Sequence, residues 1–134
     1  MLARWSDDHG RTWSDPMNLT STARDMKDPQ WRITVPGPGG AIQDRHDRLL
    51  VPCWKFDGWN NFVIYSDDHG QSWHRSDFVP GGKPGDENQL VELVDGRLLM
   101  DIRQHKGPHR WRSISRDRGK TWSEPMPGHT VTPV

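Results

Sequence analysis

The apolar residues of this chain occur in short runs that are separated by turns rich in Gly, Pro, Asp and Ser. Short segments between tight turns, with large aromatic side chains to fill a core, are typical of all-β proteins. No long window shows a helical period. The pattern predicts an all-β fold class with strands at residues 2–5, 41–43, 49–56, 61–66, 72–79, 89–94, 98–104, 111–115 and 121–126. The polar segment 20–31 is predicted to be a connection.

An octapeptide pattern, S-x-D-x-G-x-[ST]-W, occurs three times, at residues 6–13, 66–73 and 115–122. The starts of the copies are 60 and 49 residues apart, and the second shift also carries Arg-Leu-Leu at 48–50 onto Arg-Leu-Leu at 97–99. Strand-rich repeats of about 40 to 50 residues are typical of the blades of a β-propeller. Each copy follows a predicted strand, so we interpret it as the hairpin between the third and fourth strands of a four-stranded antiparallel blade.

The residue types of this motif predict a structural role. The Asp can accept hydrogen bonds from the backbone of a tight turn, the Gly allows a positive φ, and the Trp can pack between adjacent sheets. His9 and His69 are interpreted as exposed turn residues, because no second ligand recurs at a metal-binding spacing. The residues assigned to the three turns are Ser6, Asp8, Gly10, Trp13, Ser66, Asp68, Gly70, Trp73, Ser115, Asp117, Gly119 and Trp122.

The repeats divide the chain into parts of a propeller. Residues 1–20 are predicted to end one blade, residues 40–79 and 88–126 to form two complete blades, and residues 127–134 to begin the next connection. A propeller protects its strand edges by closing a ring of about four to eight blades. About two and a half blades cannot close, so the sequence is interpreted as an incomplete propeller domain with a truncated amino terminus.

Composition removes several classes of function. The 18 basic and 18 acidic residues cancel, whereas a protein that binds nucleic acid would show a basic excess. No apolar run is long enough for a transmembrane segment or a signal peptide, and the compartment is left open. The single cysteine, Cys53, excludes an internal disulfide and a cysteine-based zinc site. We expect no metal and no cofactor.

The repeated motif resembles the Asp box of the sialidases (neuraminidases), whose fold is a six-bladed β-propeller. The resemblance is sharpest in segment 86–103, Asp-Glu-Asn-Gln-Leu-Val-Glu-Leu-Val-Asp-Gly-Arg-Leu-Leu-Met-Asp-Ile-Arg, which is similar to the family stretch N-E-x-Q-V-V-E-L-x-D-G-x-L-x-x-N-x-R. Residues 35–42 resemble the family's G-P-G-H loop, and residues 50–56 its L-V-V-P strand. The resemblance extends over essentially the whole chain and implies an exo-α-sialidase, a glycoside hydrolase that removes terminal sialic acid from glycoproteins, gangliosides and oligosaccharides.

The resemblance implies roles for four residues. Glu87 matches the catalytic Glu, which takes the proton of a tyrosine nucleophile, because a phenol with a pKa near 10 is a weak nucleophile. Arg103, sixteen residues later, matches one of three arginines that bind the sialic acid carboxylate. Trp54 and Phe56 are expected near the glycerol and N-acyl groups of the substrate.

Other parts of the family site have no counterpart in the sequence. The first and third arginines, the catalytic Asp and the nucleophilic Tyr are missing, and the single tyrosine, Tyr65, is interpreted as structural. The chain alone is therefore predicted to be inactive. The sequence also departs from the family at Gly40, Asn88 and Asp101, and we expect Asp101 to compete for Arg103.

Two further interpretations stay open. The departures at these positions favour a non-catalytic Asp-box propeller that binds a glycan or a protein. The other possibility is a truncated piece without a function, in which Glu87 is a solvated residue in a Gly- and Pro-rich loop (81–86) and Arg103 is an arginine of an edge strand.

Overall fold

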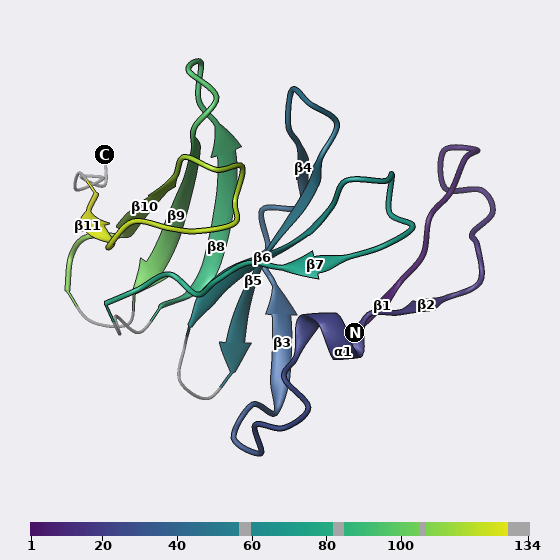
Figure 1. Cartoon of the computed structure of the whole chain (residues 1–134), viewed down its shortest axis with the longest axis horizontal. Coiled ribbons are helices and arrows are strands. Elements are labelled where there is room, and N and C mark those ends of the chain that lie inside the picture. Colours follow the sequence, from purple (N-terminus) through teal and green to yellow (C-terminus); the bar gives the residue numbers. More distant parts are fainter. Residues whose placement is uncertain (57–59, 82–84, 105–106, 129–134) are drawn as a thin grey trace.

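The computed structural model of the chain describes residues 1–56, 60–81, 85–104 and 107–128, which form three antiparallel β-sheets and one short helix, α1 (Thr20–Ala23). Sheet A pairs β1 (Leu2–Ala3) with β2 (Met17–Asn18). Sheet B has the order β3–β5–β6–β7, with β4 also paired to β5, and comprises β3 (Ile33–Pro36), β4 (Ile42–Gln43), β5 (Leu49–Phe56), β6 (Asn61–Ser66) and β7 (His74–Arg75). Sheet C has the order β11–β10–β9–β8 and comprises β8 (Gly85–Glu92), β9 (Leu98–Gln104), β10 (Trp111–Ser115) and β11 (Met126–Pro127). Figure 1 shows sheet B between the other two. The predicted all-β class is confirmed.

The longest predicted strands coincide with observed ones, and the outer strands do not. The predictions at 49–56, 61–66, 98–104 and 111–115 match β5, β6, β9 and β10 and are confirmed. The predictions at 2–5, 72–79 and 121–126 are wrong in extent, because β1, β7 and β11 have two residues each. The prediction at 89–94 begins too late, since β8 starts at Gly85. The sequence also did not predict β3 or α1.

Serine hydroxyl groups explain why the outer strands are short. The amide of Val63 in β6 donates to Ser76 Oγ at 2.9 Å, and the amide of Ile114 in β10 donates to Ser123 Oγ at 3.0 Å. At these points a side chain accepts the hydrogen bond that a backbone carbonyl would accept in a regular ladder. The regular ladder with β6 therefore ends after Arg75 in β7, and the regular ladder with β10 begins only at Met126 in β11.

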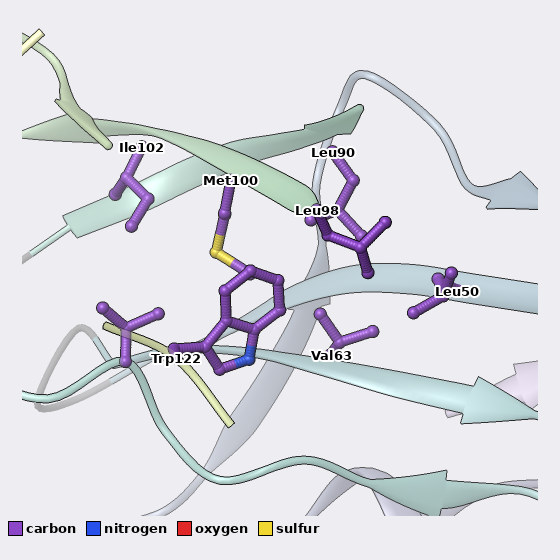
Figure 2. Close-up of a cluster of buried hydrophobic side chains, with 8 residues drawn as sticks. Leu50, Val63, Leu90, Leu98, Met100, Ile102 and Trp122 are labelled. Carbon is purple, nitrogen blue, oxygen red and sulfur yellow. The ribbon is translucent and has the colours of Figure 1, made fainter. Parts of the chain in front are cut away.

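Two clusters of buried side chains join the sheets face to face. The first lies between sheets B and C and contains Leu50, Val63, Val79, Leu90, Leu98, Met100, Ile102 and Trp122. In Figure 2 the Trp122 indole lies between Met100 of β9 and Val63 of β6. The second joins β1, β2 and α1 to sheet B and contains Leu19, Ala23, Trp31, Cys53, Phe62 and Ile64. Burial raises the pKa of the Cys53 thiol to about 12, so this residue acts as a neutral core side chain.

Charged side chains add a second connection between sheets B and C. Arg118 Nε donates to Asp44 Oδ2 at 2.7 Å, and the Asp44 side chain is only 2% exposed. Arg48 binds Asp67 through two nitrogens and donates from a third to the Arg118 carbonyl. Burial alone would raise the pKa of Asp44, but hydrogen bonds from Arg118 and from backbone amides outweigh it and hold this pKa below its ordinary value. The network fixes sheet C against the β4–β5 turn.

Each S-x-D-x-G-x-[ST]-W motif closes a tight turn through its aspartate. In the second motif, Ser66 Oγ and the Ser72 amide both donate to Asp68 Oδ1 at 2.8 Å, and Ser72 Oγ donates to Asp68 Oδ2. Asp8 and Asp117 accept the same set of bonds in their motifs. The residue before the glycine and the glycine itself both have positive φ, 56° and 88° in the second motif. The carboxylates of Asp8, Asp68 and Asp117 therefore stabilise the three turns.

We expect Asp68→Asn to lower the melting temperature of the chain at pH 7. Hydrogen bonds from the side chain and amide of Ser72, and from Ser66, lower the pKa of Asp68 to about 2. Since this lies below the ordinary value of 3.8, the ionised carboxylate stabilises the fold above about pH 4, and the contribution is lost as the pH falls through about 2. Thermal unfolding followed by circular dichroism should therefore show a deficit that shrinks over this range. The exposed Asp7 is the control, and a deficit independent of pH would contradict the prediction.

Candidate functional site

Glu87 and Arg103 come together because β8 and β9 are antiparallel neighbours. At their paired ends β8 contains one residue more than β9, which forms a β-bulge. The bulge holds Asp86 and Glu87 together opposite Arg103. The expectation that Asp86 belongs to a loop is wrong, since it lies within β8. The Cα partners on either side of the bulge are Gly85 with Gln104 and Asn88 with Ile102.

The guanidinium group of Arg103 lies against two carboxylates of unequal exposure. Its Nη1 donates to Glu87 Oε2 at 2.9 Å and lies 3.8 Å from Asp86 Oδ2. The side chains of Arg103 and Glu87 are 55% and 48% exposed, whereas that of Asp86 is 8% exposed. Asp86 Oδ1 also accepts the Glu87 amide at 2.7 Å, which fixes the bulge. An arginine has five N–H donors, so this half-exposed guanidinium can bind a further carboxylate.

The start of β8 is anchored against sheet B through close backbone contacts. Asn88 is 1% exposed, and its Nδ2 donates to the Cys53 carbonyl at 2.9 Å. A Cβ atom at Gly37 would lie 2.1 Å from the Asn88 carbonyl oxygen, so only glycine fits there. Asn61 Nδ2 donates to the Asp86 carbonyl at 2.7 Å. The departure from the family at Asn88 therefore supplies a buried anchor for the strand that carries Glu87.

Asp101 does not take the position that the sequence suggested. Arg110 Nε donates to Asp101 Oδ2 at 2.6 Å, so the carboxylate is paired with an arginine from the residue before β10. The expected competition for Arg103 is therefore not observed, because a different guanidinium from the neighbouring strand reaches Asp101 first. Gly40 lies in a turn with a φ of 86°, a conformation that favours glycine, and a Cβ there would meet no atom within 4 Å.

The two predicted aromatic residues lie on sheet B. The rings of Trp54 and Phe56 are 6.0 Å apart, with an angle of 50° between their planes. Alternation along β5 places both on the face of Leu50, which packs toward sheet C. Glu87 and Arg103 lie on the opposite face of sheet C. The structure therefore brings Glu87 and Arg103 into contact and places the aromatic pair on a neighbouring sheet.

Tyr65 lies at the opposite end of β6 from the segment that contacts Asp86. The Arg48 guanidinium lies 4.3 Å from the centre of its ring, and the His74 ring lies 5.6 Å away. Both contacts are beside the second S-x-D-x-G-x-[ST]-W turn. The structure thus separates this tyrosine from Glu87.

Sequence reasoning missed two charged residues near Glu87 and Arg103, namely Asp86 and Arg110. Asp86 could have been suspected, because it stands where the family stretch has Asn, but nothing in the sequence showed that Arg110 would meet Asp101. In the described part of the chain no group of three His, Cys, Asp or Glu side chains could hold a metal ion. Within the same residues no helix is long and apolar enough to cross a membrane.

A family model described as the BNR repeat-like domain matches residues 1–133. The sialidase of Bacteroides fragilis (strain YCH46) is 34% identical over 127 residues, which covers 92% of this chain and 22% of that protein. The solved structure of the Hadza microbial sialidase Hz136 matches with a TM-score of 0.79 and 33% identity. The match covers 92% of this chain and 24% of the Hz136 chain. The intramolecular trans-sialidase from Ruminococcus gnavus, solved with oseltamivir carboxylate, matches with a TM-score of 0.78 and 35% identity over 95% of this chain and 26% of its own.

This chain therefore spans about a quarter of the length of these relatives. The family match and the two structural matches each cover more than nine tenths of its residues. The chain belongs to the BNR repeat-like domain family and has the β-propeller-type fold of the sialidases.

Proposed function

We propose that this chain supplies Glu87 and Arg103 to the active site of an exo-α-sialidase that hydrolyses terminal sialic acid from glycoconjugates. The observation that carries the proposal is the contact of 2.9 Å between the Arg103 guanidinium and the Glu87 carboxylate on the bulge of β8. The similarity to sialidases supports it. As in the sequence-based interpretation, the first and last parts of the chain and the two sets of strands at 40–79 and 88–126 are proposed to be parts of one incomplete propeller domain.

Arg103 is the proposed carboxylate-binding group. Sialic acid carries a carboxylate on its ring, and a planar guanidinium can bind a carboxylate through two parallel hydrogen bonds. The Arg103 side chain is half exposed, so a ligand can reach it from solvent. A bound substrate carboxylate would share the guanidinium with Glu87, and one hydrogen bond from Arg103 is enough to keep Glu87 in place.

Glu87 is the proposed base. A tyrosine nucleophile must lose its proton before or during attack, and an ionised carboxylate within hydrogen-bond reach can accept it. The same negative charge would stabilise the positively charged transition state of glycoside cleavage. The Glu87 amide donates to Asp86 Oδ1, which fixes the Glu87 backbone, and Arg103 Nη1 donates to the Glu87 carboxylate. Trp54 and Phe56 follow the Cys53 carbonyl that binds Asn88 at the start of β8, and they are proposed to contact the glycerol and N-acyl groups of the sugar past this edge of sheet C.

The nucleophile itself would have to come from outside residues 1–134. Tyr65 is the only tyrosine in the sequence, and it packs against Arg48 and His74 away from Glu87. The purified chain is therefore expected to release no product from a fluorogenic sialoside. A chimera in which this chain replaces the matching segment of the B. fragilis sialidase is expected to hydrolyse it.

Three outcomes of this experiment separate the candidates. Activity of the folded chimera supports the proposal, and activity of the purified chain would contradict the need for an external nucleophile. A folded chimera that binds sialosides without cleaving them would favour the non-catalytic module. The similarity to an intramolecular trans-sialidase favours a second reaction, and the mass of the released sugar distinguishes it, since hydrolysis adds one water and intramolecular transfer does not.

A further inference from the structure

We propose that Arg110 is a positioning residue for Arg103. By binding Asp101, it keeps that carboxylate away from the Arg103 guanidinium and so leaves Arg103 open to the carboxylate of a ligand. This inference rests on the proposed function only in the identity of the ligand. The arrangement of Asp101 among Arg103, Arg110 and Arg112 is a property of the chain itself.

Asp101 and Arg103 share one face of β9. They are two positions apart, so their side chains point to the same side of the sheet, with Cα atoms about 7 Å apart. In β10, Arg112 is the Cα partner of Asp101, and Arg110, the residue before this strand, lies two positions earlier in the sequence. Asp101 therefore has three arginine neighbours: Arg103 in the same strand, Arg112 opposite it, and Arg110 next to β10. Of these, Arg110 forms the observed ion pair.

Asp101 has capacity for a second donor. Its Oδ2 accepts the hydrogen bond from Arg110 Nε, while its Oδ1 is buried and has no hydrogen-bond partner among the described residues. An unpaired buried carboxylate oxygen is costly, so Asp101 would turn toward another cation if Arg110 were removed. Arg112, the Cα partner of Asp101, is the competing cation, because its buried Nε also has no hydrogen-bond partner among the described residues. The Arg103 signal therefore shows which of the two arginines Asp101 binds when Arg110 is removed.

A third carboxylate at Arg103 would matter because two are already there. Glu87 and Asp86 lie 2.9 and 3.8 Å from Arg103 Nη1. The remaining donors of the half-exposed guanidinium are those that a ligand carboxylate needs. If Asp101 bound them, it would occupy the ligand's place and add a repulsive negative charge. Arg110 thus offsets the departure from the family at Asp101.

The test compares the 134-residue chain with Arg110→Ala, Asp101→Asn and the double variant. The readout is the side-chain Nε–H signal of Arg103 in nitrogen-15 NMR spectra, first without ligand and then during titration with free sialic acid. The methyl ester of sialic acid is the control ligand, since it lacks the carboxylate charge. Arg110→Ala is expected to shift the Arg103 signal and to weaken sialic acid binding about fivefold, the size of one exposed ion pair. The double variant is expected to restore both the position of the Arg103 signal and the affinity for sialic acid.

Each result decides the proposal. An Arg103 signal that Arg110→Ala leaves unchanged would overturn it, as would a shift that Asp101→Asn does not reverse, because the effect would then not pass through Asp101. If Arg103 does not respond to sialic acid in any of the four proteins, the proposed role of Arg103 fails, while the spectra without ligand still decide the role of Arg110. The Arg45 signal, from the ion pair with Glu92 at the other end of sheet C, reports whether each variant is folded. If Arg110→Ala does not fold, Arg110→Gln replaces it: the neutral side chain fills similar space, and an Arg103 signal that this variant leaves unchanged would overturn the proposal.

Discussion

Glu87→Gln in the chimera with the B. fragilis sialidase is expected to lower kcat by a factor of about 10² to 10⁴, the usual contribution of a general base. Glutamine keeps the shape of the side chain, and its carbonyl oxygen can still accept the hydrogen bond from Arg103. It cannot accept the proton of a phenol. Because the lost interaction acts in the transition state, KM should change much less than kcat. Steady-state kinetics with a fluorogenic sialoside measure both parameters.

A matched substitution separates the role of Glu87 from a general effect of lost charge. Glu124 is exposed in the segment before β11, and Glu124→Gln removes the same charge outside the β8–β9 pair that carries Glu87 and Arg103. This variant should keep the kinetic parameters of the parent chimera. Equal kcat values for the Glu87→Gln and parent chimeras would exclude Glu87 as the base. A rise in KM with unchanged kcat would instead make Glu87 a binding residue.

Trp122→Ala is expected to reduce the free energy of unfolding by about 3 to 5 kcal/mol, the usual range when a buried tryptophan is truncated. Trp122 is 8% exposed and fills the first cluster between sheets B and C (Figure 2). Its Nε1 also donates to Ser76 Oγ at 3.3 Å. Folded domains are stable by only about 5 to 15 kcal/mol, so this loss would leave the contact between the sheets marginal. Urea unfolding of the purified chain measures it.

Trp13 provides the control for this prediction within the same chain. It occupies the same position of the first S-x-D-x-G-x-[ST]-W motif, but it is 59% exposed. Trp13→Ala is expected to change the free energy of unfolding by less than about 1 kcal/mol, as for most exposed positions. Equal losses for the two variants would mean that the tryptophan stabilises its own turn, and packing between sheets would not be the cause.

Three of the four strands that the sequence predicted well, β5, β6 and β9, contain runs of at least three apolar residues, whereas the fourth, β10, does not. β5 and β9 have seven or eight residues and carry side chains of the clusters, so burial and periodicity agree there. The outer strands β7 and β11 were overestimated because serine side chains replace the backbone partner of the third strand. A propensity for strand does not show which atom will accept an amide hydrogen bond. The strand β3 was missed because its residues precede a Pro- and Gly-rich loop.

The candidate site was only partly visible in the sequence. The spacing of sixteen residues and the resemblance to sialidases indicated Glu87 and Arg103, and the antiparallel hairpin between them brings the two side chains together. The bulge that adds Asp86 to the pair depends on a shift in register between β8 and β9. The partner of Asp101 depends on how β10 lies beside β9. Both features depend on how two strands are paired, and the sequence of one strand does not show this.

The sequence by itself determined the three turns, because each is closed by hydrogen bonds between residues at most four positions apart, such as those from Ser66 and Ser72 to Asp68. It likewise indicated the main strands β5, β6, β9 and β10. Only the tertiary structure decided which of the repeated tryptophans is buried and which carboxylate meets Arg103. Identical motifs place Trp13 at the surface and Trp122 in the core, because burial depends on the sheet that packs against each turn and not on the residues within it.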